Sequence, residues 1–336
     1  MKWLALDIGG ANLKIADGGD FAACQPFALW QHSAQLHQAL EGLLKTAPAS
    51  DAVAVTMTGE LADCYRTKAE GVRHILSAVQ RAATDRQVRV YRNDGRFVAT
   101  DVAIANPVPV AAANWHALAR FAGRFVDTGI ALLIDIGSTT TDVIPLNDGN
   151  PVPEGFTDTE RLITGELVYA GITRTPIATL VAKLPYRGQQ CGIARECFAR
   201  TQDVYLTLGE LPDNEADLDT PDGRPATKND ARRRLARMIC ADEESFDHQD
   251  ADQVANTIAQ QQCHLLTGAI ERVVGRQPIP IETAIISGSG EFLARRAVLD
   301  VHPAIRLLSL SELSGIPISH CGAAHAVAVL AREECR

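Results

Sequence analysis

The sequence is poor in aromatic residues and has no long apolar run, and each absence excludes a class of protein. Phe, Trp and Tyr make up 5% of the 336 residues, too few for the aromatic platforms on which single-stranded nucleic acids stack. No apolar run reaches the roughly 18 residues that a membrane span needs. The formal net charge is −9, which argues against a nucleic-acid partner because phosphate backbones attract basic surfaces.

The cysteine pattern and the first residues indicate a cytoplasmic protein. The eight cysteines are scattered and include no Cys-x-x-Cys, so we expect free thiols rather than disulfides or a zinc site. The start, Met1 to Asp7, carries one lysine and a very short apolar run that an aspartate ends, which predicts no signal peptide. Hydrophobic residues make up 46% of the chain, enough to build one large domain or two ordinary ones.

The order of apolar segments predicts an α/β fold. Residues 2–7, 12–16 and 21–29 read as three strands joined by glycine turns, and helical spacing follows at 32–45. Strands at 51–57 and 88–91 then alternate with helices at 69–83 and 110–121. Helical patterns follow later in the chain, at 192–200, 228–240, 253–273 and 321–332. We expect the first three strands to form an antiparallel meander, and the alternation that follows is an α/β pattern.

The opening pattern occurs twice. Asp7-Ile8-Gly9-Gly10 ends one apolar strand, and Asp135-Ile136-Gly137-Ser138 ends another, with a short polar turn and a second apolar strand after each. Such a repeat indicates a duplication at the scale of a domain.

A buried strand that ends in Asp-x-Gly can build a phosphate site. Asp7 and Asp135 are candidate Mg²⁺ ligands, because Mg²⁺ prefers carboxylate oxygen beside phosphate oxygen. Glycine lets backbone N–H groups approach an anion closely. Lys14 would add a positive charge if its side chain faces the same way, which strand alternation leaves open. The candidate phosphate donors are Gly9, Gly10, Asn12, Gly137, Ser138, Thr139 and Thr140.

Two further turns are candidates for the site. Gly288-Ser289-Gly290 follows a strand and precedes a helix, which suits either a nucleotide at a helix N-terminus or an ordinary tight turn. Glu60 follows the strand at 51–57. It is a candidate general base, or else a solvated acid at the start of a helix.

Other charged residues have plainer interpretations. Arg174 and Lys183 are candidates for binding an anionic substrate, although surface ion pairs are the commoner fate of such residues. The run Arg232-Arg233-Arg234 predicts a solvated helix face, because acidic residues surround it. Asp142 either supports the second turn or ends its strand.

These motifs together resemble the actin-like ATPase superfamily. Asp7–Gly10 resembles its first phosphate loop, and residues 135–143 resemble its second loop in the form found in the hydantoinase A/oxoprolinase family. Residues 285–290 resemble its adenosine motif. The resemblance implies a two-lobed, ribonuclease H-like fold with duplicated βββαβαβα lobes. The first lobe would span 1–125 and be completed by a helix at 321–336, and the second would span 126–320 with a subdomain inserted at about 154–277.

A narrower resemblance concerns residues 7–14, 56–64 and 196–205. These segments are similar to the branch that contains tetrahydromethanopterin-linked one-carbon-transfer proteins and the archaeal methanofuran-precursor synthase. The resemblance implies a transferase that condenses an aminomethylfuran methyl diphosphate with the phenol of γ-glutamyltyramine and releases diphosphate. Mg²⁺ and a small phosphorylated substrate would be its ligands, and a homo-oligomer stays open.

Two other classes of function remain open from the sequence. An ATP-dependent kinase or a hydantoinase/oxoprolinase-type amidohydrolase would use the same loops together with a nucleotide at Gly288–Gly290. A non-enzymatic nucleotide-binding switch would bind ATP without acting on a small substrate.

Overall fold

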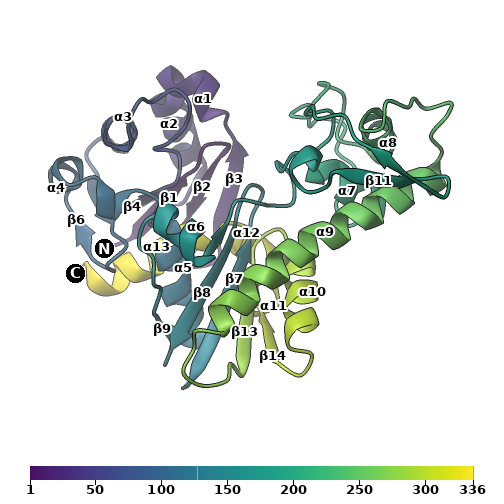
Figure 1. Cartoon of the computed structure of the whole chain (residues 1–336). Coiled ribbons are helices and arrows are strands. Elements are labelled where there is room, and N and C mark those ends of the chain that lie inside the picture. Colours follow the sequence, from purple (N-terminus) through teal and green to yellow (C-terminus); the bar gives the residue numbers. More distant parts are fainter. Residues whose placement is uncertain (127, 336) are drawn as a thin grey trace.

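The computed structural model describes residues 1–126 and 128–335. They form two α/β lobes side by side, with a smaller body that projects from the second lobe (Figure 1). No helix in these two ranges is both long and apolar enough to cross a bilayer. All eight cysteines are free in this part of the chain, as the sequence predicts.

The first lobe is built on a sheet of strand order β3-β2-β1-β4-β5-β6. The strands β1, β2 and β3 pair antiparallel, whereas β4 and β5 lie parallel to β1. Leucines of α2 and the valine, isoleucine and leucine side chains of α3 cover one face in a buried cluster. The strands are β1 (Trp3–Ile8), β2 (Asn12–Ala16), β3 (Ala22–Pro26), β4 (Ala52–Met57), β5 (Gln87–Tyr91) and β6 (Phe97–Val98). The helices are α1 (Leu29–His32), α2 (Leu36–Thr46), α3 (Lys68–Ala83) and α4 (Thr100–Ala105).

The second lobe repeats this arrangement with the strand order β10-β8-β7-β13-β14. The strands β7 and β8 pair antiparallel, and β13 and β14 lie parallel to β7. The predicted duplication is therefore present in strand order and in strand direction. The strands are β7 (Ile130–Ile136), β8 (Thr141–Asn147), β9 (Asn150–Pro151), β10 (Leu167–Val168), β13 (Thr283–Ser287) and β14 (Arg306–Ser309). Its helices include α6 (Asp158–Thr164), α10 (Glu291–Val301), α11 (Leu310–Ser314) and α12 (Ile316–His320).

Two helices rich in small residues join the lobes. Helix α5 (Asn114–Ala122) packs against α13 (Gly322–Glu334), and α13 also lies on β1 and β4. Alanines let the two backbones approach closely, and Trp115 fills the space toward β7 and β8. The last helix of the chain therefore lies against the first sheet. The predicted division into lobes stays a prediction.

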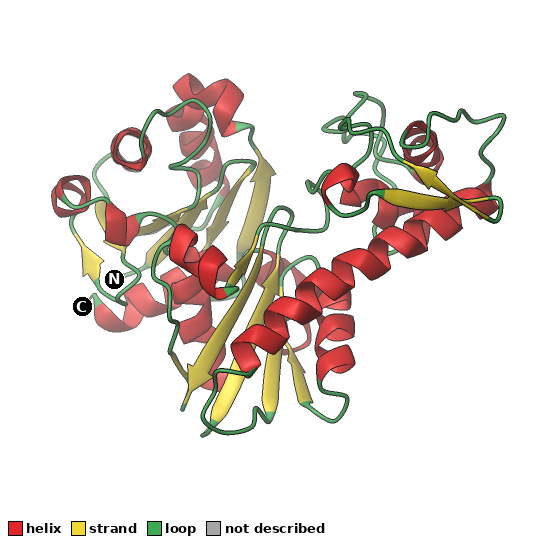
Figure 2. Ribbon diagram, in the orientation of Figure 1, coloured by secondary structure: helices red, strands yellow, loops and turns green. Residues whose placement is uncertain are grey.

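The projecting body lies between α6 and β13 in the sequence. It holds the hairpin β11 (Lys183–Tyr186) with β12 (Gln189–Gly192), and the helices α7 (Thr201–Leu208) and α8 (Lys228–Arg237). Helix α9 (His248–Val274) runs from this body down to the second sheet (Figure 2). Strand β10 belongs to the second sheet, although it lies inside the predicted insertion.

Two sequence-based expectations for this body are wrong. The predicted helix at 192–200 is the end of β12 followed by a loop. The helix begins only at Thr201, where the Asp203 carboxylate accepts a hydrogen bond from the backbone N–H of Arg200 at 2.9 Å. Arg234 does not lie on a solvated face. Its side chain is 0% exposed, because Asp203 and Asp222 neutralise its charge inside the body.

Candidate active site

The two Asp-x-Gly turns have the same local geometry. Gly9 N–H donates to the Asn12 carbonyl at 3.0 Å, and Gly137 N–H donates to the Thr140 carbonyl at 2.9 Å. The strand registers match as well, because Asp7 lies opposite Lys14 and Asp135 lies opposite Asp142. Asp7 and Asp135 therefore occupy equivalent positions in the two lobes.

The two turns lie close enough for their charges to interact. Burial raises the pKa of Asp7, Lys14 opposes the rise, and Asp142 of the other lobe adds to it. Burial raises the pKa of Asp135 to about 6, with Asp142 adding to the rise and Ser287 and Lys14 opposing it. Two carboxyl groups that both resist ionisation favour a cation between them.

Lys14 supplies one positive charge to this cluster. Its burial alone would lower the pKa of the ammonium, but Asp7 and Asp135 outweigh that effect and raise it. Because Lys14 lies directly opposite Asp7 in the antiparallel pair β1–β2, the two side chains are on the same face of the sheet. In the second lobe the equivalent position is Asp142, and its carboxylate is bound by the buried Arg161.

The residues fit Mg²⁺ with a phosphorylated ligand better than a metal caged by protein alone. Asp7 Oδ1 is buried and lacks a hydrogen-bond partner in the described part of the chain. Over the same residues no three His, Cys, Asp or Glu side chains are grouped to hold a metal. Mg²⁺ commonly takes one or two carboxylates, several waters and substrate phosphates. Asp7 and Asp135 would supply the carboxylates.

The second turn is held from behind by residues 171–174. The Ser138 carbonyl accepts from the backbone N–H groups of Thr173 at 3.1 Å and Arg174 at 3.0 Å. A Cβ on Gly171 would lie 2.5 Å from the Ser138 carbonyl carbon, so this approach requires glycine. The Ser138 and Thr139 hydroxyls lie 3.4 Å apart on the half-buried turn.

The turn Gly288–Gly290 packs directly on the second Asp-x-Gly turn. Gly290 N–H donates to the Ile136 carbonyl at 2.9 Å, and Ser289 is half-buried. Gly288 has φ +88°, and a Cβ there would lie 2.7 Å from Asp135 Oδ1. The structure therefore brings this turn to Asp135, as a phosphate or nucleotide site would require.

Glu60 and Glu291 occupy equivalent positions in the two lobes, as the hydrogen bonds of the glycine before each glutamate show. Gly59 N–H donates to the Ile8 carbonyl at 3.0 Å, as Gly290 N–H does to that of Ile136. Each glycine is followed by a glutamate. Glu291 has a structural role, because its carboxylate oxygens accept hydrogen bonds from the side chains of Ser309, Ser311 and Ser319.

Glu60 has a different environment. It is 0% exposed, and both carboxylate oxygens lack a hydrogen-bond partner within residues 1–126 and 128–335. Burial raises its pKa to about 7, while Asp158 adds to the rise and Lys68 opposes it. Neither Asp7 nor Asp135 is among the groups that shift this pKa.

Two hydroxyl groups beside the aspartates were not found from the sequence. Thr56 on β4 lies opposite Asp7, and Ser287 on β13 lies opposite Asp135. Both hydroxyls are buried, and that of Ser287 lies close enough to Asp135 to oppose the rise of its pKa. Only the strand register reveals them, although a hydroxyl residue near the end of each of two equivalent strands is a signal that the sequence does hold.

Two sheets of the same strand order, with an Asp-x-Gly turn at the end of each first strand, give the chain a two-lobed fold of the actin-like type. The family model described as hydantoinase/oxoprolinase matches residues 51–308. The chain belongs to the hydantoinase/oxoprolinase family.

Two curated relatives carry the same name, (4-{4-[2-(γ-L-glutamylamino)ethyl]phenoxymethyl}furan-2-yl)methanamine synthase. The protein from Methanocaldococcus jannaschii is 33% identical over 334 residues, which is 98% of each chain. The protein from Methanococcus vannielii is 28% identical over 218 residues, covering 64% of this chain and 96% of the relative.

Solved structures with a similar fold have lower sequence identity to this chain. An activator of 2-hydroxyisocaproyl-CoA dehydratase from Clostridium difficile has a TM-score of 0.45 at 14% identity, covering 100% of this chain and 97% of its own. The archaeal actin homologue Ta0583 has a TM-score of 0.45 at 11% identity, covering 99% and 100%.

Proposed function

We propose that this protein is a transferase of methanofuran-type cofactor biosynthesis. It condenses an aminomethylfuran methyl diphosphate with the phenol of a γ-glutamyltyramine-type substrate and releases diphosphate. The observation that carries the proposal is the 33% identity to the Methanocaldococcus jannaschii synthase over 98% of both chains. The name of that relative describes a phenoxymethyl group on a furan, which is the ether that such a condensation forms.

The bond changes balance without a further reactant. The phenol oxygen forms a bond to the methylene carbon of the furan, and the bond from that carbon to the diphosphate oxygen breaks. The diphosphate leaves with the electron pair, and the phenol proton passes to a base. The protein must therefore stabilise the charge that grows on diphosphate and accept one proton.

The two aspartate turns are the diphosphate site. Asp7 and Asp135 would hold Mg²⁺, which supplies positive charge to the diphosphate oxygens when bound. Lys14 lies within electrostatic range of both aspartates and adds a further charge. Backbone and hydroxyl donors cradle the phosphates: Gly9, Gly10, Asn12, Gly137, Ser138, Thr139 and Thr140. The turn at Gly288, Ser289 and Gly290 closes the site beside Asp135.

Glu60 is our candidate for the base. A pKa of about 7 suits proton transfer near neutral pH. Its complete burial means that the phenol reaches it only after the lobes or the turn at 58–60 move, as lid and domain motions allow in many enzymes.

The test is a set of calorimetric titrations with Mg²⁺ and, separately, diphosphate, ATP and ADP. We expect micromolar binding of diphosphate with no gain from an adenine group, and loss of that binding in Asp135→Asn. A clear preference for ATP would favour an ATP-dependent kinase or amidohydrolase instead. If none of the three binds, the phosphate site is wrongly assigned.

A further inference from the structure

Two arginines outside the diphosphate site converge on one carboxylate. Arg174 Nη1 lies 3.2 Å from Asp219 Oδ2, and Arg200 Nη1 lies 3.4 Å from Asp219 Oδ1. The Asp219 side chain is 62% exposed, whereas the two arginines are mostly covered. The polar ends of this cluster are thus open to a ligand while the arginine stems are held by the protein.

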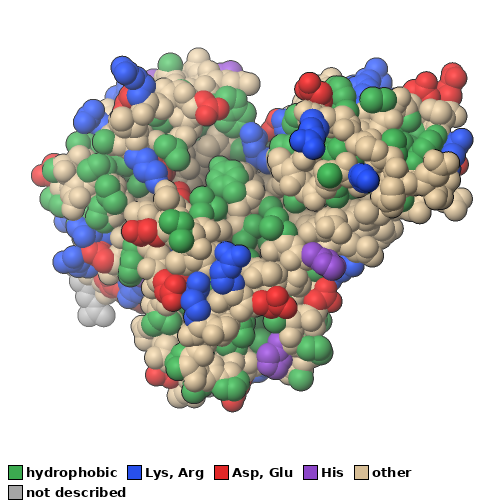
Figure 3. Space-filling view, in the orientation of Figure 1, with side chains coloured by type: hydrophobic (Ala, Val, Ile, Leu, Met, Phe, Trp, Pro, Cys, Tyr) green, Lys and Arg blue, Asp and Glu red, His purple; other side chains and the backbone are tan. Residues whose placement is uncertain are grey.

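The cluster is attached to both aspartate turns. The backbone N–H of Arg174 donates to the Ser138 carbonyl of the second turn at 3.0 Å. The guanidinium of Arg174 lies 4.6 Å from the centre of the Trp30 ring, which belongs to the first lobe. Trp30 follows Leu29, whose N–H donates to the Gly10 carbonyl of the first turn at 2.9 Å. The cluster therefore spans the gap between the first lobe and the projecting body, which is visible as a notch in Figure 3.

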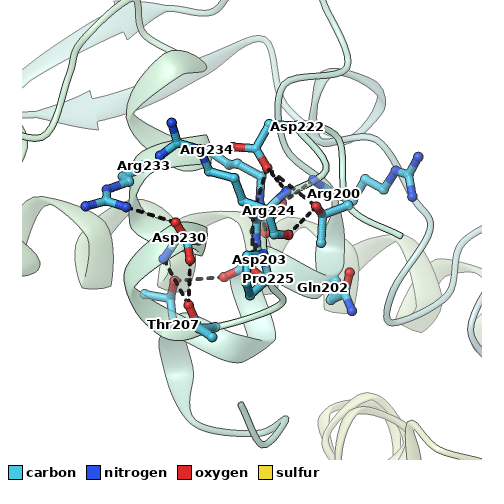
Figure 4. Close-up of polar contacts among 12 residues, drawn as sticks. Arg200, Gln202, Asp203, Thr207, Asp222, Arg224, Pro225, Asp230, Arg233 and Arg234 are labelled. Carbon is cyan, nitrogen blue, oxygen red and sulfur yellow. Dashed lines mark hydrogen bonds and ion pairs between the residues drawn. The ribbon is translucent and has the colours of Figure 1, made fainter. Parts of the chain in front are cut away.

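The position of Arg200 is fixed by buried charges behind it. The backbone N–H of Arg200 donates to Asp203 Oδ2 at 2.9 Å, and Asp203 Oδ1 accepts from Nε of Arg234 at 2.7 Å (Figure 4). Arg234 also bonds to Asp222 at 3.0 Å. Because Arg234 and Asp203 are both fully buried, the start of α7 is held rigidly, and the Arg200 side chain extends from a fixed point.

The cluster carries charges of both signs. Asp217 lies beside Asp219, but one of its oxygens accepts from Gln202 at 2.9 Å and the other from the Asp219 backbone N–H at 3.0 Å. The two guanidinium groups therefore share one exposed carboxylate, that of Asp219. A site that offers two cations and one anion suits a zwitterion, whose carboxylate and ammonium each bind the opposite charge.

We propose that Arg174, Arg200 and Asp219 bind the α-amino-acid head group of a γ-glutamyl substrate. The two guanidinium groups bind its α-carboxylate in the fork geometry that arginine favours, and Asp219 binds its α-ammonium. The phenol end then points past Ser138 toward the diphosphate site. This inference rests on the proposed function, because it places the second substrate of that reaction.

The test compares γ-glutamyltyramine with tyramine, which has the same phenol and lacks the glutamyl group. In Arg200→Met we expect kcat/KM for γ-glutamyltyramine to fall about 10- to 100-fold, mainly through KM, since a charged hydrogen bond contributes about that much. The value for tyramine should not change. The matched control is Lys228→Met, which removes an exposed charge from the start of α8 in the same body and should alter kcat/KM for neither substrate.

Calorimetry separates this inference from the proposed function. If the wild type releases no diphosphate with either phenol, the proposed reaction fails, but binding still decides the subsite. Tighter binding of γ-glutamyltyramine than of tyramine, lost in Arg200→Met and kept in Lys228→Met, supports the subsite. Equal binding of both compounds to the wild type, or an equal loss for both in Arg200→Met, overturns it.

Discussion

Asp135→Asn should stabilise the ligand-free protein while it removes the diphosphate site. Asp135 is half-buried, and its pKa stands at about 6 instead of the usual 3.8. The folded state therefore binds a proton more tightly than the unfolded chain does. Stability falls as the pH rises from about 4 to 6, and the whole penalty is present at pH 7.5.

The size of the effect follows from the pKa. A rise of about two pKa units corresponds to about 3 kcal/mol at roughly 1.4 kcal/mol per unit. Screening by solvent on the open side of the carboxyl lowers this to about 2 kcal/mol. Asparagine has almost the same shape and no charge, so Asp135→Asn should raise the free energy of unfolding by about 1–2 kcal/mol at pH 7.5.

Urea unfolding at pH 7.5 and pH 4.5, with and without Mg²⁺ and diphosphate, is the assay. Without ligand, the variant should be more stable than the wild type at pH 7.5, and the difference should shrink at pH 4.5. Saturating ligand at about 100 times Kd should stabilise the wild type by about 2.7 kcal/mol and leave the variant unchanged. A variant that is less stable at pH 7.5, or that still responds to ligand, would refute the reasoning.

Three further substitutions, two of them with a control variant, test other parts of the structure. Asp203→Asn leaves the buried Arg234 with Asp222 as its remaining carboxylate partner and should cost about 1–3 kcal/mol in urea unfolding. Its control, Arg233→Ala on the same helix, should change stability by less than about 1 kcal/mol. If Glu60 is the base, kcat/KM of the wild type should rise with pH through about 7. In Glu60→Gln this pH-dependent rise should disappear, and kcat/KM should fall by about 100-fold or more. A pH profile that is unchanged in the variant would exclude the role. Gly288→Ala forces a Cβ to within 2.4 Å of a backbone oxygen at φ +88° and should destabilise the protein. Gly268→Ala, with open space around it on α9, should stabilise it by up to about 1 kcal/mol.

The parts of the site that repeat in the sequence were the parts that could be predicted. Asp7 and Asp135 each follow a buried apolar strand and precede a glycine, so local sequence alone specifies strand, carboxylate and turn. Gly288–Gly290 was found for the same reason. In each case the signal lies within a few consecutive residues.

The features that were missed depend on contacts between distant segments. The hydroxyls of Thr56 and Ser287 lie beside the aspartates only because of the register of two parallel strand pairs. Arg234 looks like a surface residue in a basic run, and its burial follows from Asp203, 31 residues earlier in the chain. Neither strand register nor a long-range ion pair can be derived from local periodicity.

The most direct test of the central claim is a single reaction. The purified protein is incubated with Mg²⁺, the aminomethylfuran methyl diphosphate and γ-glutamyltyramine, and both released diphosphate and the mass of the product are measured. We predict one diphosphate for each furan–phenol ether, with both substrates required and no need for ATP. Ether formation only when ATP is consumed, or diphosphate release that does not depend on the phenol, would contradict the account.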